Sequence, residues 1–280
     1  MDWQTTRFRI DLTRPRVMGI VNVTPDSFSD GGRYLSSDSA LAHCDRLLAE
    51  GADILDIGGE STRPGARVPA IHEEMDRVMP VLHHALALGA AVSIDTSRPE
   101  MIRAALAAGV DFVNDVRALR QPGALEAVAE RPRCGVCLMH MRGEPGTMQT
   151  APVYDDVVVE VRNFLRERVR ALADAGVERE RVVLDPGIGF GKTPEHNWTL
   201  MQRQHELLSL GRPLLVGWSR KSALGALTGR PVDRRVAASV AAALAAVQRG
   251  ARIVRVHDVA ATVDALAVWR EAGLGVQAQN

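Results

Sequence analysis

The chain has 280 residues, of which 46% are hydrophobic and only 4% aromatic, so a large core filled mainly by Ala, Val and Leu is expected. Its 34 basic residues balance 34 acidic residues, which argues against a general nucleic-acid or membrane-surface binder because such proteins carry a basic excess. The N-terminal residues lack the apolar segment of a secretion signal, and no run approaches the ~18 apolar residues of a membrane span, so a cytoplasmic enzyme is expected.

Eight short apolar runs, most of them ending at a polar residue, predict β-strands along the chain. In order they are VMGIVN ending at Asn22, DILDIG carrying Asp56, AVSID ending at Asp95, DFVND with Asn114, GVCLMH ending at His140, RVVLD ending at Asp185, LLVGWS ending near Ser219, and RIVRVH with Arg255 and His257. Amphipathic stretches between them predict helices, among them 38–50, 98–109, 155–175, 233–249 and 259–273. Glycines at or just after most of these stretches supply helix ends.

Strands that alternate with helices pair in parallel through right-handed crossovers. Eight such units in 280 residues suit a single-domain (β/α)8 TIM barrel spanning 1–280, in which residues 1–14 form an N-terminal extension or a short hairpin that caps the barrel. A doubly wound open sheet is the main alternative, but no dinucleotide fingerprint opens the first unit. The α/β barrel is therefore the predicted fold class.

In such a barrel the carboxyl ends of the strands and the loops after them form the mouth of the active site. The polar residues at the strand ends are therefore expected to converge there: Asn22, Asp56, Asp95, Asn114, Asp185, Arg255 and His257. Each of them alone could equally be a turn former or a helix cap. Together they need cations or hydrogen-bond donors, because several carboxylates at one mouth are costly without them.

The three cysteines, Cys44, Cys134 and Cys137, do not suit a disulfide framework because their number is odd and the chain is long. Cys134 and Cys137 have the spacing of a redox motif. They lie in a predicted buried strand, however, where positions three apart face opposite ways. A buried structural role is favoured over a thiol site.

Two glycine-containing loops suggest ligand binding. NVTPDSFSDGG, residues 22–32, is rich in turn formers and carries one aromatic ring, Phe28. GGESTRPGA, residues 58–66, offers Ser61, Thr62 and Arg63, which suit a phosphate or a carboxylate. A surface turn is the alternative interpretation of the second loop.

Two later segments also combine glycines with basic residues. DPGIGFGKT, residues 185–193, fails as a phosphate loop because Pro186 stands where that motif needs glycine, so its glycines are expected to turn sharply and present Phe190. GWSRKSALG, residues 217–225, places Arg220 and Lys221 after a strand. We expect this pair to form one cationic edge with Arg255 and His257, and a solvated basic turn is the alternative.

Eight motifs, in order, make the chain resemble the dihydropteroate synthase family over almost its whole length. They are NVTPDSFSDGG, DIGGESTRPGA, SIDTSRPE, DFVNDV, LMHMRGEP, LDPGIGFGKTPEHN, GWSRKS and RVHDV. The resemblance implies a (β/α)8 barrel, a homodimer, and condensation of 6-hydroxymethyl-7,8-dihydropterin diphosphate with p-aminobenzoate to 7,8-dihydropteroate and diphosphate, in folate biosynthesis. Alternatives are a pterin-dependent corrinoid methyltransferase, a non-catalytic pterin-binding homologue, and a phosphate-loop nucleotide enzyme.

The resemblance also implies roles for individual residues and a requirement for Mg2+. Catalytic residues would be Asp95, Lys221 and Asn22. The pterin would be bound by Asp95, Asn114, Asp185, Lys221 and Arg255, and the diphosphate by Asn22, Thr62, Arg63, Arg255 and His257. The p-aminobenzoate pocket, which sulfonamide inhibitors would share, would comprise Phe28, Ser61, Thr62, Arg63, Pro64, Phe190, Lys221 and Ser222. Asn22 and Asp30 would hold the Mg2+ ion.

A dissociative reaction is the mechanistic hypothesis. The electron-rich dihydropterin can delocalise positive charge at its exocyclic methylene once the diphosphate leaves, and Asp95 is expected to stabilise that cation. The weakly nucleophilic aniline nitrogen then needs no strong base. This agrees with the lack of a Ser/His/Asp or Cys/His arrangement in the sequence.

Overall fold

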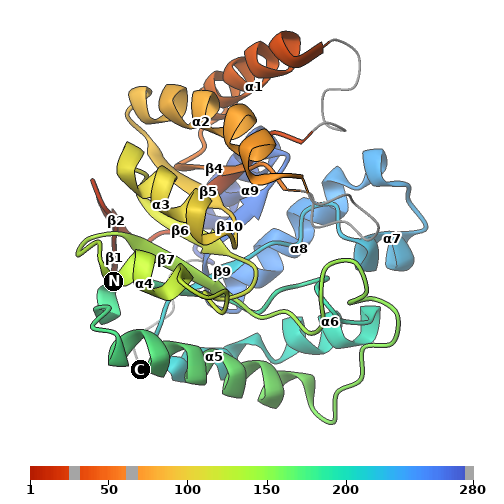
Figure 1. Cartoon of the computed structure of the whole chain (residues 1–280). Helices are drawn as coiled ribbons and strands as arrows, with labels where there is room; N and C mark the ends of the chain where they lie inside the picture. Colours follow the sequence, from red (N-terminus) through yellow and green to blue (C-terminus); the bar gives the residue numbers. More distant parts are fainter. Residues whose placement is uncertain (25–31, 61–68, 275–280) are drawn as a thin grey trace.

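The computed structural model describes residues 1–24, 32–60 and 69–274, and for 32–37 only the backbone. Eight parallel strands close into a barrel in the order β10-β3-β4-β5-β6-β7-β8-β9, which confirms the predicted (β/α)8 barrel (Figure 1). The strands are β3 (Arg16–Asn22), β4 (Ile54–Gly58), β5 (Ala91–Asp95), β6 (Phe112–Asp115), β7 (Gly135–Met139), β8 (Val182–Asp185), β9 (Leu214–Val216) and β10 (Ala251–Val256).

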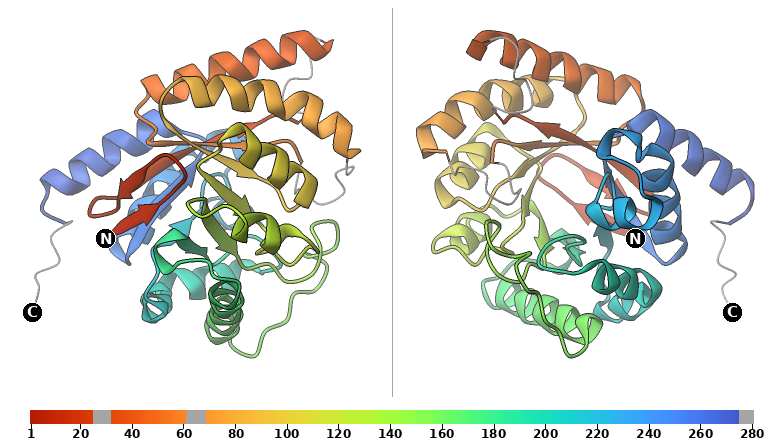
Figure 2. Two further views of the ribbon diagram at one scale, coloured as in Figure 1. Left: turned by 60° about the vertical axis from the view of Figure 1, so that its left-hand side comes forward. Right: turned by 90° about the vertical axis from the view of Figure 1, so that its right-hand side faces the viewer.

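Helices surround the barrel on its outer side (Figures 1 and 2). They are α1 (Gly32–Ala49), α2 (Ile71–Ala87), α3 (Pro99–Ala108), α4 (Ala124–Ala129), α5 (Val157–Asp174), α6 (Pro194–Gln202), α7 (Ser222–Thr228), α8 (Val236–Gln248) and α9 (Val259–Glu271). Short 3-10 turns occupy Arg179–Arg181, Gln204–Leu210 and Val232–Arg234. No helix in the described part of the chain is long and apolar enough to cross a membrane.

All eight predicted strands are present, but several element boundaries differ from the prediction. Strand β9 ends at Val216 rather than near Ser219, and β10 ends at Val256, so that His257 follows the strand. Helix α8 begins only at Val236 because a 3-10 turn after Pro231 precedes it. Four helices, α2, α4, α6 and α7, are not among the predicted ranges: α2 contains an internal proline, α4 and α7 have only 6 and 7 residues, and α6 has a polar sequence.

A two-stranded hairpin closes the N-terminal end of the barrel (Figure 2). It consists of β1 (Asp2–Gln4) and β2 (Arg9–Asp11). Trp3 is fully buried, its ring centroid lies 4.2 Å from that of Phe112, and its Nε1 donates to the Arg181 carbonyl at 2.9 Å. Hairpin residues thus join one apolar cluster with inward-facing strand residues. The hairpin therefore fills the N-terminal end of the barrel. The polar strand ends lie at the opposite, carboxyl end.

The cysteines belong to the core, as expected. Cys44 and Cys134 pack in the layer between strands and helices, whereas Cys137 packs inside the barrel. All three are free thiols and buried. Burial raises the pKa values of the Cys44 and Cys134 thiols to about 12, so they stay protonated and unreactive at neutral pH. The structural interpretation of the Cys134–Cys137 pair is confirmed.

Candidate active site at the barrel mouth

The register of the sheet brings predicted site residues into one row at the carboxyl ends of the strands. Asn22 on β3 pairs with Gly58 on β4, Gly58 with Asp95 on β5, and Asp95 with Asn114 on β6. Paired residues of neighbouring strands point to the same face of a sheet. Gly58 leaves room in this row, because a Cβ atom there would lie 3.3 Å from the Cβ of Asp95.

A guanidinium neutralises two carboxylates beside this row. Arg255 on β10 places Nε 2.5 Å from Asp56 Oδ2 and Nη2 2.7 Å from Asp95 Oδ2. Burial disfavours the charge on Arg255, but Asp56 and Asp95 outweigh that effect and raise its pKa. Asn114 Nδ2 donates to Asp56 Oδ2 at 3.2 Å, and the Ser93 hydroxyl donates to Asp56 Oδ1. The cations and donors that the converging carboxylates need are therefore supplied within the mouth.

Asp56 is a site residue to which sequence reasoning assigned no role. Its side chain is fully buried and accepts from three different strands, through Ser93, Asn114 and Arg255. It lies two residues before Gly58, on the same face of β4. A carboxylate inside an otherwise apolar strand is the signal in the sequence, but its partners depend on the register of the closed barrel.

Asp95 and Asp185 lie in environments that disfavour their charge. Burial raises the pKa of Asp95 to about 7, although Arg255 opposes the shift. Burial likewise raises the pKa of Asp185 to about 6, against the hydrogen bond from the Gly187 amide at 2.7 Å and the positive charge of Lys221. Both carboxyl groups can therefore gain or lose a proton near neutral pH, which is common at catalytic sites.

The loop after β8 and the residue before α7 bring an aromatic ring and an ammonium together. Lys221 Nζ lies 4.2 Å from the centroid of the Phe190 ring, within cation–π range. Burial, together with the positive charge of Arg255, lowers the pKa of Lys221 to about 8. Gly189 makes the approach possible, because a Cβ there would lie 3.0 Å from Lys221 Cδ. Ser222 begins α7 directly after Lys221.

The predicted cationic edge is only partly correct. Arg220 forms an ion pair with Asp258, Nη2 to Oδ1 at 2.6 Å, so its charge is already balanced. His257 Nδ1 lies 3.0 Å from Ser219 Oγ, and burial lowers the pKa of His257 to about 3, so its imidazole is neutral. Lys221 and Arg255 carry the positive charge, and His257 can offer only a neutral donor.

At the mouth end of the barrel the structure places, on strands or in the loops directly after them, Asn22, Asp95, Asn114, Asp185, Phe190, Lys221, Arg255 and His257. Ser222 lies at the same end, as the first residue of α7. Six predicted residues lie outside the described residues: Phe28, Asp30, Ser61, Thr62, Arg63 and Pro64. For these six, the assigned roles stay predictions.

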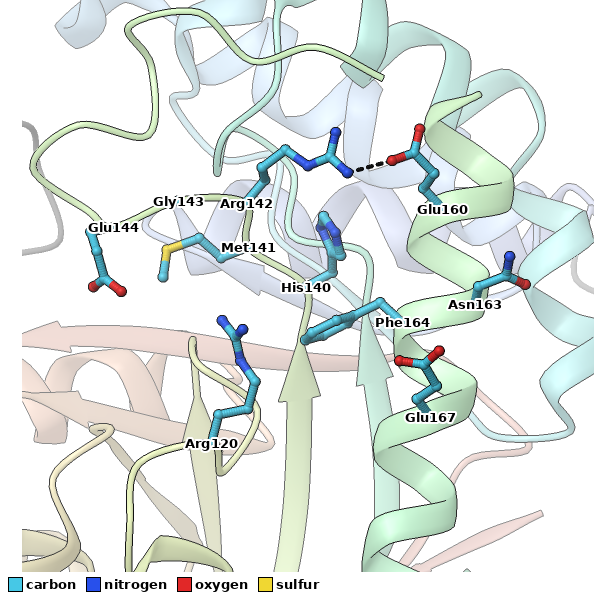
Figure 3. A pocket seen from close by; sticks show the side chains of 10 residues that line it. All are labelled: Arg120, His140, Met141, Arg142, Gly143, Glu144, Glu160, Asn163, Phe164 and Glu167. Carbon is cyan, nitrogen blue, oxygen red and sulfur yellow. Dashed lines mark hydrogen bonds and ion pairs between the residues drawn. The ribbon is translucent and has the colours of Figure 1, made fainter. Parts of the chain in front are cut away.

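A surface cavity of about 520 Å³ lies beside the mouth, between the loop after β7 and α5 (Figure 3). His140, Arg142 and Phe164 are among its lining residues, and Arg142 pairs with Glu160 across its rim. None of the residues that line it belongs to the predicted site. The cavity therefore neighbours the candidate site without being part of it.

The described site can recognise a flat, polar heterocycle that carries an anionic group. Asp185 can accept from two neighbouring donors, Asn114 can both donate and accept, and Lys221 can donate. The planar guanidinium of Arg255 can stack on a ring or bind an oxyanion. Phe190 offers an aromatic face for a second ring.

Residues 18–257 match the model of the pterin binding enzyme family. The chain belongs to this family. Among pterin-binding enzymes it is 53% identical to the dihydropteroate synthase of Neisseria meningitidis serogroup C over 278 residues, which is 98% of each chain. Pterin-binding enzymes of known structure also superpose closely on it.

The dihydropteroate synthase of Xanthomonas albilineans, solved with 4-aminobenzoic acid, is 55% identical, has a TM-score of 0.90 and covers 95% of each chain. That of Yersinia pestis, solved with a sulfonamide drug complex, is 46% identical and has a TM-score of 0.91 over 98% of this chain and 99% of the other. The resemblance read from the eight motifs is therefore confirmed, and the chain is a dihydropteroate synthase by family.

Proposed function

We propose that the protein condenses 6-hydroxymethyl-7,8-dihydropterin diphosphate with p-aminobenzoate and releases 7,8-dihydropteroate and diphosphate, a step of folate biosynthesis. The observation that carries the proposal is the buried Asp185 carboxylate near Lys221, whose ammonium lies over Phe190. This arrangement suits a pterin edge on one side and an aromatic amine on the other. The relatives are dihydropteroate synthases, so no observation favours a corrinoid methyltransferase or a non-catalytic homologue.

In this proposal the pterin lies between the polar floor and Arg255. Asp185 and Asn114 bind its guanidine-like edge, Lys221 donates to its ring carbonyl, and Arg255 lies over the ring face. Departure of diphosphate leaves positive charge on the exocyclic methylene, and Asp95 stabilises it. The aniline nitrogen of p-aminobenzoate then forms the new C–N bond and loses a proton to solvent.

Binding of p-aminobenzoate is proposed at the outer part of the mouth. Phe190 packs against its ring, and Lys221 and the start of α7 at Ser222 receive its carboxylate. Sulfonamide drugs imitate this substrate in shape and charge, and we propose that they compete for the same position. The relative from Yersinia pestis, solved with such a drug, supports this proposal.

Mg2+ is proposed as the metal of the reaction. Asn22 stands at the end of β3, in the same row as Asp95, and its amide oxygen is a hard ligand that suits Mg2+. Among the described residues no group of three or more His, Cys, Asp or Glu could hold a metal alone, so substrate oxygens and water would complete the coordination. When bound, Mg2+ supplies charge neutralisation for the leaving diphosphate.

The proposed reaction can be tested with purified protein, both substrates and Mg2+. We expect 7,8-dihydropteroate and diphosphate to form in equal amounts, and we expect chelation with EDTA to abolish the reaction until Mg2+ is returned. Product formation without diphosphate release would contradict the reaction. Undiminished turnover after chelation would contradict only the metal.

A bell-shaped pH profile of kcat/KM is expected. Asp185 and Asp95, with pKa values raised to about 6 and about 7, must lose their protons to accept hydrogen bonds or stabilise a cation, so activity rises through that range. Lys221, with its pKa lowered to about 8, must keep its proton, so activity falls above that pH. In Lys221→Arg the alkaline fall should move upward because a guanidinium stays charged. An unchanged alkaline fall in that variant would remove Lys221 as its cause.

A homodimer in the cytoplasm is proposed as the working state. Leu227 on α7 and Val232 just after it are 67% and 55% exposed, and a second copy would cover such side chains. The three free, buried thiols suit a reducing compartment. Sedimentation of a single-subunit species at micromolar concentration would contradict the dimer.

A further inference from the structure

The chain contains only two lysines among its 34 basic residues, and both lie at the barrel mouth. They are Lys192, after β8, and Lys221, before α7. Every other basic residue, on the surface and in the core, is arginine. These two positions therefore use a compact ammonium with three donors where the rest of the chain uses a planar guanidinium.

Lys192 joins two loops with its ammonium. Its side chain is 2% exposed, and Nζ donates to the Gly187 carbonyl at 2.9 Å and to the Phe190 carbonyl at 3.0 Å. Nζ also lies 2.9 Å from His140 Nδ1 and 3.3 Å from the His140 carbonyl, at the end of β7. Its partners in the described chain are thus one imidazole and three carbonyl oxygens, so that acceptors are available for all three N–H groups of an ammonium.

His140 is suited to accept this hydrogen bond. Burial, together with the charges of Lys192 and Arg142, lowers the pKa of His140 to about 2, so the imidazole is neutral at all physiological pH values. Nδ1 accepts from the ammonium, and the ring proton is therefore assigned to Nε2. The Phe164 ring packs perpendicular to the imidazole, with 5.0 Å between the ring centroids.

Lys192 joins the loop after β7 to the turn 187–191. This turn has little intrinsic preference for one backbone conformation. Gly187, Gly189 and Gly191 all have positive φ, and glycine adopts such angles at no steric cost but with a large loss of freedom. The turn packs tightly on the β7 loop, because a Cβ on Gly187 would lie 1.9 Å from the His140 carbonyl oxygen. The turn therefore packs directly against the backbone at the end of β7.

This turn presents Phe190 to Lys221. The Phe190 carbonyl accepts directly from Lys192, and the Phe190 ring lies under the Lys221 ammonium at 4.2 Å. Other side chains also contact the turn: Gln149 and Asn197 at Gly189, Tyr154 at the Gly191 carbonyl and Asp185 at the Gly187 amide, but only Lys192 bonds to Phe190 itself among the side-chain hydrogen bonds of the described residues. A change at Lys192 would therefore be transmitted to the position of the Phe190 ring.

We propose that Lys192 is a positioning residue for the p-aminobenzoate side of the site, which holds the Phe190 ring under Lys221 by joining the turn after β8 to His140. The identity of the substrate in this proposal rests on the proposed function. The role of Lys192 in fixing the position of the Phe190 ring does not depend on activity. Lys192 touches neither reacting group, so its effect is expected on substrate binding more than on the chemical step.

Steady-state kinetics of Lys192→Met test the effect on binding. We expect the KM for p-aminobenzoate to rise about tenfold or more, whereas the KM for the dihydropterin diphosphate changes less than about threefold, because only the p-aminobenzoate side loses its preorganised wall. Equal changes in both KM values, or a fall in kcat alone, would overturn the proposal.

Arg181 offers a matched control. It is also a buried cation that donates to backbone carbonyls, those of Cys134 and Val128, but it lies at the opposite end of β8. Arg181→Met is expected to lower the Tm without changing the KM for p-aminobenzoate relative to the KM for the dihydropterin diphosphate. If Lys192→Met fails to fold, Lys192→Gln can be used, because it keeps an uncharged donor. It is expected to raise the KM for p-aminobenzoate more than the KM for the dihydropterin diphosphate, but to a smaller degree than Lys192→Met.

The presence of only two lysines permits a test that needs no activity. Protein grown with lysine labelled with 13C at Cε should give two side-chain signals, and Lys192→Met leaves the signal of Lys221 alone. The Phe190 ring should shift the Lys221 Hε signal upfield in the wild type. In Lys192→Met we expect that signal to move toward its position in Phe190→Leu, whereas Arg181→Met should leave it in place. A wild-type position in Lys192→Met would overturn the proposal even if the reaction itself is correct.

Discussion

Replacing Arg255 with methionine is expected to lower the free energy of unfolding by about 3–5 kcal/mol, because it leaves buried carboxylates without their cation. Asp56 is fully buried, and Asp95 has a side-chain exposure of 19%. Both lose a charged hydrogen bond, of 2.5 Å for Asp56 and 2.7 Å for Asp95. Urea unfolding measured near pH 8 gives the effect directly. Catalytic activity should fall with it, because the same guanidinium would contact the substrate.

Two further variants show whether the cause is the unpaired charge. Asp95→Asn added to Arg255→Met removes one of the unpaired carboxylates and is expected to restore part of the lost stability. Arg220→Met breaks the ion pair with Asp258 nearby, where the Arg220 side chain is 38% exposed, and is expected to cost less than about 1 kcal/mol. If Arg255→Met and Arg220→Met proved equally mild, Arg255 would not be the cation that stabilises the mouth.

Asp95→Asn is expected to slow the chemical step by about 10²–10³-fold, the usual loss when one group that stabilises developing charge is removed. The change keeps the size of the side chain and an oxygen that can accept from Arg255 Nη2. Single-turnover experiments with the dihydropterin diphosphate already bound measure the step without contributions from binding. They should be run above pH 7, because the pKa of Asp95 is raised to about 7.

The same experiment can reject the dissociative hypothesis. A single-turnover rate near that of the wild type would show that Asp95 does not stabilise a cation. A loss confined to the binding of the dihydropterin diphosphate would limit Asp95 to substrate recognition.

The eight strands, the barrel and the family could be predicted from the sequence because the signals are local. Apolar runs of four to seven residues, polar strand ends and glycines after helices depend on neighbours in the chain. The convergence of Asn22, Asp95 and Asn114 followed from the fold class alone, since parallel strands end at the same side of a barrel. The unpredicted helices have weaker local patterns: α2 contains an internal proline, α4 and α7 are short, and α6 has a polar sequence.

The sequence by itself thus determined the barrel and the polar residues at its mouth, whereas only the tertiary structure decided how those residues pair. Arg220 and Lys221 are adjacent in the chain, yet Arg220 is neutralised by Asp258 and Lys221 lies over Phe190. Lys192 looked like part of a failed phosphate loop, and its partner His140 is 52 residues away. Charge state and hydrogen-bond partner depend on burial and on contacts between distant segments, and neither is encoded in a residue's immediate neighbours.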